Sequence, residues 1–375
     1  MTYTLIGAPV SLYTGKVRGY LRWKNVPFRE RLSTREVYKQ DILPRVGWPV
    51  IPVVIHEDGS EHGVTLQDTT DIIDYVEQNE PGPSVYPDTP RQRLAALILE
   101  LFGDEWLVIP AMHYRWRYNR DFAQAEFGAS SHPHLPPEEQ FAAAQKAVDF
   151  FSGTVGGLGV HPESEAAVED AYEAFLEVFD AHLAEHDFLF GSRPSIGDYG
   201  LLGPLYAHLL RDPESGKLMR RIAPRVADWA ERCHAPQHAL SGDFLPDDEI
   251  PDGVMAMLRM FAAQQLPVLI DTARVLGEWA DANPEIVAGN GEVPRLLGFH
   301  KAVIGRGDAA VEVDRGVFPF ALWMLQRVTD CLGALAGEER AAAEEMLRSI
   351  GGSALIDFKA PLRLDRRRFK LAVAG

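Results

Sequence analysis

The stretch that decides the fold is residues 47–71, GWPVIPVVIHEDGSEHGVTLQDTTD. An apolar run from Val50 to Ile55 is followed by an acidic turn that contains a glycine. A second short segment, from Gly63 to Leu66, then leads into a helical pattern over residues 70–78. Short apolar runs bounded by turn residues are typical of strands, and apolar residues spaced by three and four indicate a helix. The stretch therefore predicts two neighbouring strands and then a helix.

Pro52 lies inside the apolar run. In the middle of a sheet it would remove an N–H group from the ladder of hydrogen bonds. A cis bond between Ile51 and Pro52 at the start of the strand removes this conflict, whereas a trans bond would fit an edge strand. The residues alone leave both alternatives open.

Residues 3–43, which precede this stretch, predict the remaining strands and helices of the same domain. Residues 3–7 are rich in β-forming types and end at a Gly-Ala-Pro turn, and residues 14–23 have helical spacing. A second extended piece covers residues 27–32, and a polar stretch runs on to Leu43. The first 80 residues thus predict the order β-α-β-(α)-β-β-α.

Three hydroxyl groups stand where the first strand passes into the first helix, on Ser11, Tyr13 and Thr14. A helix N-terminus has unpaired N–H groups and the positive end of the helix dipole, so it stabilises an anion such as a thiolate. The alternative is structural, because Thr14 is also a common type of helix cap.

Asp68 and Thr69 open the helix that follows the last strand of this unit. The aspartate offers a carboxylate to an ammonium group, and the threonine offers a hydroxyl and an N–H to a carboxylate. Together they complement the head group of an amino acid. The alternative is again a plain helix cap.

In order and spacing, these three motifs resemble the glutathione-binding half of the glutathione transferase family. Gly47 to Pro52 stands where that family has a G-x-V-P segment with a cis proline, and Asp68-Thr69 stands where it has Glu or Asp followed by Ser or Thr. Further on, Ser195 and Asp198 resemble the buried capping box of the family's helical half, which we interpret as structural.

The resemblance implies an α/β thioredoxin-like domain at residues 1–80, an all-α domain at residues 91–235, and a cleft between them for glutathione as co-substrate. Residues 236–375 would be an additional, mostly α extension with a β-hairpin over residues 300–313. We find no chemical role for this extension in the sequence. Its basic stretch, Arg363 to Lys370, is predicted to pack as an edge strand.

The resemblance also implies roles for single residues. Ile51 would offer backbone hydrogen bonds to the cysteinyl part of glutathione, Pro52 would be cis, and Asp68 and Thr69 would hold the γ-glutamyl end. The glycyl carboxylate needs a cation or another donor. Its candidates in the first domain are Lys39, Trp48, Arg45 and Lys16.

Thr14 falls where serine- and cysteine-type members of the family have the residue that contacts the glutathione sulfur. Tyr13 and Ser11 remain alternatives for this contact. A hydroxyl donor stabilises the thiolate and so lowers the thiol pKa from about 8.5 toward neutrality. Because none of the three residues is cysteine, a mixed-disulfide mechanism is disfavoured.

An aromatic and basic patch at the start of the helical region is the candidate pocket for the second substrate. Its members are Trp106, His113, Arg115 and Trp116. Aromatic residues on a helix usually belong to the core, but the charged members would be costly there without partners. The patch therefore suggests an anionic or aromatic electrophile.

Composition narrows the function classes. The chain has 375 residues with 46% hydrophobic and 24% charged positions, so it can form a packed core. Its net charge of −17 disfavours nucleic acid as a partner, and no apolar run reaches the roughly 20 residues of a membrane span. Two cysteines indicate a reducing compartment, so we expect a cytoplasmic protein. His132 and His134 lack the companions of a metal site, so no metal is expected.

Two functions follow from these observations. The first is a glutathione transferase-like enzyme that activates the glutathione thiol for attack on a small electrophile. The second is a non-catalytic protein that retains the fold for binding or as a scaffold. The resemblance also implies a homodimer.

Overall fold

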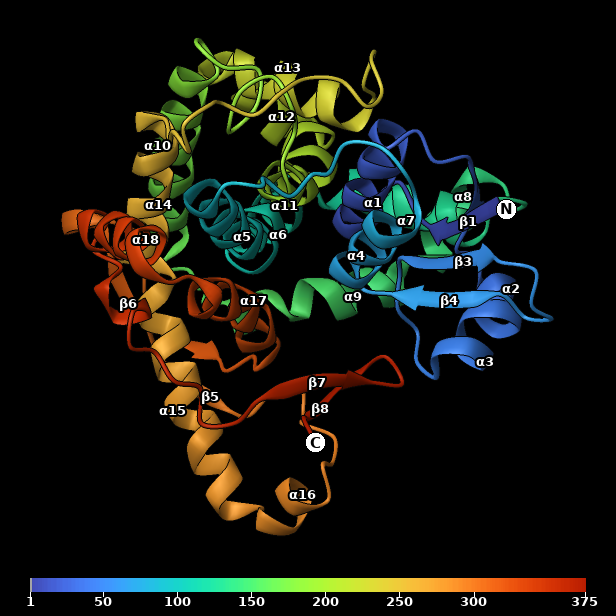
Figure 1. The fold of residues 1–375 in the computed structure, drawn as a ribbon. Coiled ribbons are helices and arrows are strands. Elements are labelled where there is room, and N and C mark those ends of the chain that lie inside the picture. Colours follow the sequence, from blue (N-terminus) through green and yellow to red (C-terminus); the bar gives the residue numbers. More distant parts are fainter. Residues whose placement is uncertain (1) are drawn as a thin grey trace.

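The computed structural model describes residues 2–375 and begins with one four-stranded sheet (Figure 1). In sheet order the strands are β2 (Phe28–Leu32), β1 (Thr2–Gly7), β3 (Val53–Glu57) and β4 (Val64–Gln67). β1 pairs with β2 in parallel, and the other two pairs are antiparallel. The predicted strands of the first domain are therefore confirmed.

The sheet is covered on both faces because successive side chains of a strand point to opposite sides. Tyr3 and Leu5 pack on the side of helices α1 (Leu12–Trp23) and α4 (Thr69–Asn79), whereas Ile6 packs on the other side. That other side is covered by a run of short helical segments, which are α2 (Arg35–Val37), a π-helical turn (Tyr38–Ile42) and α3 (Leu43–Val46). The arrangement is the thioredoxin-like fold that the resemblance implies.

The strand register brings three chain segments to one edge of the sheet. Ile6 lies opposite Val53, and Val53 also lies opposite Gln67. The end of β1, the start of β3 and the end of β4 therefore meet. The bond between Ile51 and Pro52 at this edge is cis.

Helices form the second part of the molecule. They are α5 (Pro90–Glu105), α6 (Val108–Tyr118), α7 (Arg120–Ser131), α8 (Pro137–Ala143), α9 (Gln145–Gly153), α10 (Glu165–His182), α11 (Ile196–Pro204), α12 (Pro213–Ile222) and α13 (Pro224–His234). α5 and α11 cross at Gly103 and Gly200, where a Cβ on Gly103 would lie 2.3 Å from the carbonyl carbon of Gly200. Only glycine permits this close approach of the two backbones.

Ser195 and Asp198 form the predicted capping box at the start of α11. The buried Asp198 carboxylate accepts hydrogen bonds from the Ser195 N–H at 2.8 Å and from the Leu189 N–H and Trp229 Nε1–H, both at 3.1 Å. Burial raises the pKa of Asp198 to about 6. The box thus connects the loop before α11 with α13.

The C-terminal region continues the same hydrophobic core and does not form a separate one. Its elements are α14 (Asp252–Gln264), α15 (Leu266–Ala282), α16 (Pro284–Ala288), β5 (Phe299–Ile304), β6 (Val311–Gly316), α17 (Phe320–Ala334), α18 (Gly337–Ser349), β7 (Leu364–Arg367) and β8 (Lys370–Val373). β5 pairs with β6 and β7 with β8, in two separate hairpins. The hairpin near residues 300–313 and the strand in the basic stretch are therefore confirmed.

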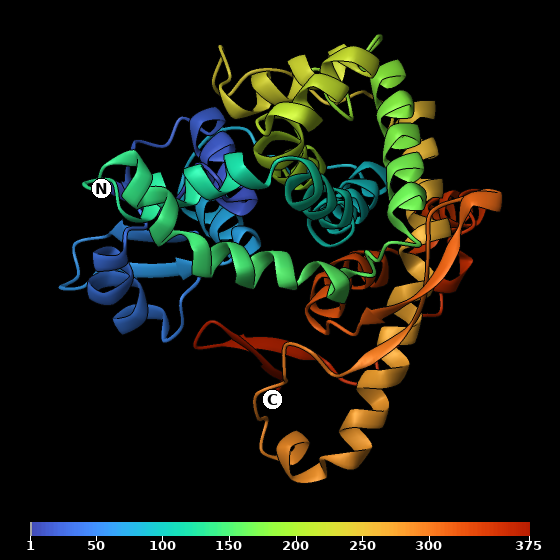
Figure 2. The ribbon, with the colours of Figure 1, turned by 180° about the vertical axis from the view of Figure 1, so that it is seen from behind.

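Figures 1 and 2 show how this region wraps around the molecule. α15 extends away from the helical core, and the chain then returns so that the β7–β8 hairpin reaches toward the first domain. Between residues 2 and 375, no single helix is long and apolar enough to cross a membrane, although α14 and α15 meet the same test together as a pair bent by 40°.

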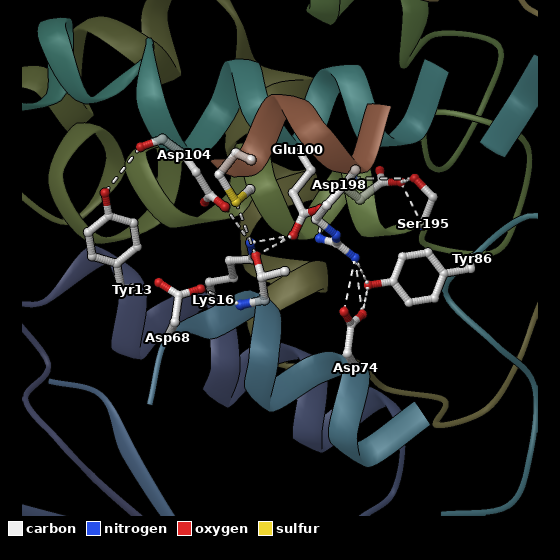
Figure 3. A network of polar contacts seen from close by, with 12 residues as sticks. Tyr13, Lys16, Asp68, Asp74, Tyr86, Glu100, Asp104, Ser195 and Asp198 are labelled. Atoms are coloured by element: carbon white, nitrogen blue, oxygen red, sulfur yellow. Dashed lines mark hydrogen bonds and ion pairs between the residues drawn. The ribbon is translucent and has the colours of Figure 1, made fainter. Parts of the chain in front are cut away.

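A buried network of charges joins the three parts (Figure 3). The Lys16 ammonium on α1 contacts the carboxylates of Glu100 at 3.0 Å and Asp104 at 2.5 Å on α5. Glu100 also accepts from Arg327 on α17 at 2.6 Å, and Arg327 reaches Asp74 on α4 at 3.0 Å. Burial alone would lower the pKa of Lys16, but these carboxylates raise it. Each charge in the network therefore depends on partners from another part of the chain.

Replacing Arg327 with methionine should destabilise the protein strongly. The change leaves Glu100 buried and removes one of its two cations, and breaking a buried pair costs about 3–5 kcal/mol. We expect a loss of this size in the free energy of unfolding, measured by urea denaturation. The matched control is Arg348→Met, which removes an exposed pair with Glu344 and should cost less than about 1 kcal/mol. Equal effects of the two variants would contradict a structural role for the network.

Replacing Ser195 with alanine should cost about 1–2 kcal/mol, because the N-cap of α11 loses its hydroxyl. Asp198→Ala should cost more, about 3 kcal/mol or above, since three buried N–H donors lose their acceptor. Thermal unfolding of the two variants checks this order. The reverse order would mean that the carboxylate is not the centre of the box.

Candidate functional site at the edge of the first sheet

Tyr13 is the hydroxyl residue that faces the helical half from the sheet edge. Its O–H donates to the Asp104 carbonyl on α5 at 3.1 Å. Burial raises the pKa of Tyr13 well above its ordinary value, so the group stays protonated and remains a donor at neutral pH. Figure 3 shows Tyr13 and Asp68 on the same side of the buried network, and the charge on Asp68 also raises the Tyr13 pKa.

Ser11 and Thr14 are placed differently. The Ser11 hydroxyl caps α1 and accepts from the Thr14 N–H at 3.2 Å. The Thr14 side chain is fully buried against β1, where a Cβ on Gly7 would lie 2.3 Å from its Cγ2 atom. Its hydroxyl oxygen has no hydrogen-bond partner among residues 2–375. Of the three candidates, Tyr13 is thus the one whose hydroxyl contacts α5.

The segment before the cis proline forms the next part of the site. Pro52 is buried, and Ile51 and Trp48 are half-buried. Arg295, from the C-terminal region, places its guanidinium carbon 4.9 Å from the centre of the Trp48 ring. This cation–π contact brings a positive charge to the edge where the resemblance expects glutathione.

The other three candidates for binding the glycyl carboxylate, Lys39, Arg45 and Lys16, do not form a cluster at this edge of the sheet. Lys39 is exposed on the π-helical turn. Arg45 donates to the His62 carbonyl at 2.8 Å, and Lys16 is fully buried in its ion pairs. The expectation that Lys16 is available to a ligand is therefore corrected, since its ammonium group already serves the interior network.

The Asp68 carboxylate both caps α4 and forms an ion pair with the C-terminal region. One carboxylate oxygen accepts from the Thr70 N–H at 3.0 Å and caps α4. The other lies 3.2 Å from Nη1 of Arg366, which belongs to β7 of the C-terminal region. Arg366 also donates to the Gln67 side chain, and its Nε lies 3.2 Å from Asp71. The carboxylate that the sequence analysis assigns to an ammonium group thus already holds a cation of the same chain.

Glu105 and Arg315 are two further ionisable groups near this edge that the sequence analysis did not identify. Burial raises the pKa of Glu105 to about 8 and lowers the pKa of Arg315 to about 10. The Arg315 guanidinium lies 5.5 Å from the Trp106 ring and 5.4 Å from the Phe318 ring. Within residues 2–375, neither group forms an ion pair within 4 Å, and for each the effect of burial on the pKa is larger than that of the other's charge.

The four residues predicted to line the second-substrate pocket each contact a different part of the helical region. Trp106 donates to Gln264 on α14, and His113 contacts Glu169 on α10 at 2.8 Å. Arg115 is fully buried, with two bonds of 2.7 Å to Asp212, and Trp116 stacks on Phe127. The two charged members, Arg115 and His113, thus have carboxylate partners that the sequence could not show, of which Asp212 is buried and Glu169 is partly exposed.

A small cavity lies beside Trp106, lined by α5, α10 and the turn of the β5–β6 hairpin. Its volume is about 20 Å³, which is room for about one water molecule. In the part of the chain that the structure describes, no group of three His, Cys, Asp or Glu side chains has the geometry of a metal site. Both cysteines are free thiols.

Comparison with known proteins agrees with this architecture. The model of the glutathione S-transferase N-terminal domain matches residues 5–84, and the model of the C-terminal domain matches residues 162–232. A search of curated proteins finds no match.

Several solved structures are similar at low identity. A glutathione S-transferase from Rhodospirillum rubrum F11 is 15% identical with a TM-score of 0.42, and the match covers 67% of this chain and 97% of that one. FzlA from C. crescentus is 16% identical with a TM-score of 0.41, over 68% and 98% of the two chains. Poplar glutathione transferase F1 is 17% identical with a TM-score of 0.39, over 63% and 94%.

The two domain matches and the fold lead to one conclusion. The match to the first domain covers the sheet edge with its cis proline, and the match to the second covers the capping box of α11. The chain therefore contains the N-terminal and C-terminal domains of the glutathione S-transferase family, matched at residues 5–84 and 162–232, and it carries an additional C-terminal region beyond residue 234.

Proposed function

We propose that the protein binds glutathione at the edge of the first sheet and activates its thiol for attack on a small electrophile. One observation carries this proposal. The strand register brings together the hydroxyl residues after β1, the cis-proline segment before β3 and the acidic turn after β4. These are the three segments that family members use for the sulfur, the cysteinyl backbone and the γ-glutamyl group.

In this proposal Tyr13 contacts the sulfur. Its raised pKa keeps the O–H group intact at neutral pH, so on binding the hydroxyl would exchange its hydrogen bond to the Asp104 carbonyl for one to the thiolate, and it does not compete with the thiol for ionisation. The start of α1 adds the positive end of the helix dipole. Both effects lower the pKa of the bound thiol from about 8.5.

The remaining groups would position the tripeptide. The backbone of Ile51 would bind the cysteinyl unit, Asp68 would bind the γ-glutamyl ammonium, and Thr69 its carboxylate. The thiol proton passes to water, the sulfur lone pair forms a bond with the electrophilic carbon, and the leaving group departs with its electron pair. Catalysis then comes from thiolate stabilisation and from holding the two reactants together.

A second candidate is a protein that retains the fold without catalysis. The observation that favours it is the ion pair between Arg366 and Asp68, which occupies the carboxylate needed for the γ-glutamyl group. Assays with an aryl halide, an epoxide and a peroxide distinguish the two candidates. Glutathione binding without turnover of any of the three would favour the non-catalytic protein.

Replacing Tyr13 with phenylalanine should lower turnover of an aryl halide at least about tenfold, or about 1.4 kcal/mol of barrier, because the thiolate loses its donor. The pH at which turnover is half-maximal should rise toward the free thiol value of about 8.5. Tyr118→Phe is the matched control, since that hydroxyl contacts Glu169 away from the sheet edge. If Thr14→Val lowers turnover and Tyr13→Phe does not, the contact with the sulfur belongs to Thr14.

Binding of reduced glutathione near pH 7 should release a proton, because the bound thiol ionises. Calorimetric titration in two buffers of different ionisation enthalpy measures the affinity and the proton release together. Release close to one proton is expected if the site stabilises the thiolate. Binding without release would mean that the thiol stays protonated, and it would argue against activation.

A further inference from the structure

We propose that the tip of the C-terminal hairpin β7–β8, residues 366–370, is a plug that closes the γ-glutamyl end of the site. In this arrangement the Arg366 guanidinium takes the place of the ammonium group of the ligand. The proposal rests on the proposed function for the identity of the ligand, and on the contacts of the hairpin for the closure itself.

Arg366 is held as an occupant of an acidic subsite. Its side chain is only 9% exposed, and it contacts both Asp68 and Asp71 at 3.2 Å. The same guanidinium donates to the side chain of Gln67 and lies over the ring of Trp323, 5.5 Å from its centre. Arg366 therefore fills the subsite mainly through charge, because its Nη2 donates to Gln67 whereas its contacts with Asp68 and Asp71 are ion pairs and its buried Nε has no hydrogen-bond partner among residues 2–375.

A second residue of the hairpin covers the neighbouring part of the edge. Phe369 packs against the hydrophobic cluster of the first domain to which Trp48, Val50 and Ile51 also belong. Arg366 therefore contacts the acidic turn assigned to glutathione, and Phe369 packs on the same cluster as the residues before the cis proline. A single hairpin tip reaches both.

The base of the hairpin is anchored to the C-terminal region and not to the site. The Gln326 side chain on α17 exchanges two hydrogen bonds with the backbone of Leu364, at 2.9 and 2.6 Å. On the other strand, the Leu371 carbonyl accepts from the Val293 N–H at 2.9 Å. Two exposed contacts also hold the tip to this region, from Arg367 to the Asn290 carbonyl at 3.2 Å and from Lys370 to Glu292 at 3.0 Å. In the proposal these contacts break when the tip leaves the site, while the base stays in place.

Backbone strain is concentrated at the tip. The two turn residues, Arg368 and Phe369, have φ values of 49° and 64°. Two-residue hairpin turns of this kind favour Asn and Gly, and other residues pay about 1 kcal/mol or more at each such position. In the proposal the turn relaxes when the tip leaves the site, so this cost is present only while the contacts of Arg366 and Phe369 hold the tip in place.

In this proposal Asp68 binds either the Arg366 guanidinium or the ammonium group of glutathione, but not both. A guanidinium and an α-ammonium group carry the same charge and both donate to carboxylates. Glutathione therefore competes with Arg366 for Asp68, and the site fills only from the population of molecules in which the tip has left. The apparent affinity is reduced by the fraction of open molecules.

The test compares the full-length chain with its Arg366→Ala variant in two measurements. Carbodiimide labelling of Asp68, read by mass spectrometry without any ligand, reports whether the tip covers the carboxylate. Calorimetry reports the affinity for reduced glutathione. We expect labelling of Asp68 and affinity each to rise at least tenfold in the variant. Arg363→Ala is the matched control, because its exposed pair with Asp330 lies outside the site.

Arg368→Gly tests the opposite direction. Arg368 is exposed, and glycine relieves the strain of the turn without removing the contacts of Arg366 or Phe369. This variant should label Asp68 more slowly and bind glutathione more weakly than the unchanged chain. Phe369→Ser provides a second opening variant if Arg366→Ala fails to fold.

The outcomes separate the two proposals. Faster labelling of Asp68 with no glutathione binding in any variant supports the plug and contradicts the proposed function. Unchanged labelling in both opening variants overturns the plug. Equal glutathione affinity in the unchanged chain and the opened variants also overturns it, because the tip then does not restrict access.

Discussion

The buried contact between Lys16 and the carboxylates of α5 is the constraint on which the rest of the structure depends. A charge inside a protein is stable only with partners, and here the partners come from three different parts of the chain. Arg327 compensates Glu100, so α17 is required for the charge balance between α1 and α5. Burial raises the pKa of Asp104, whereas the Lys16 ammonium beside it lowers that pKa, so the charge of Asp104 depends on its contact with Lys16. The C-terminal region therefore completes the interface between the two family domains.

Local sequence patterns were sufficient to predict the sheet and the capping box of α11, whereas the cis form of Pro52 followed only from the family resemblance. Each of these depends on residues that are neighbours in the chain, such as Ser195 and Asp198. Arg366 is different, because its partner Gln67 lies 299 positions away. The run of three arginines was visible in the sequence, but nothing in it indicates which acidic turn the run meets. Contacts of this kind are determined by the path of the chain between α15 and β7.

The aromatic and basic patch shows the same limit for a candidate site. A buried arginine without partners would be costly, which is why Arg115 suggested a ligand. The structure provides Asp212 as its partner, which lies 97 residues further on at the residue before α12. By contrast, Glu105 and Arg315 remain without ion pairs in the described residues and lie close to Tyr13 and Trp106. Perturbed ionisable groups in a buried setting are better pointers to chemistry than aromatic content alone.

The attachment of Arg366 to the same chain also affects how the site responds to concentration. A tethered group has an effective concentration, of the order of millimolar for short flexible links, which dilution of the protein does not change. Under the two proposals, free glutathione would compete with this internal cation, and occupancy of the site would follow the level of the tripeptide over a range set by the hairpin. A protein of this design would respond to the thiol supply of its surroundings and would be insensitive to its own abundance.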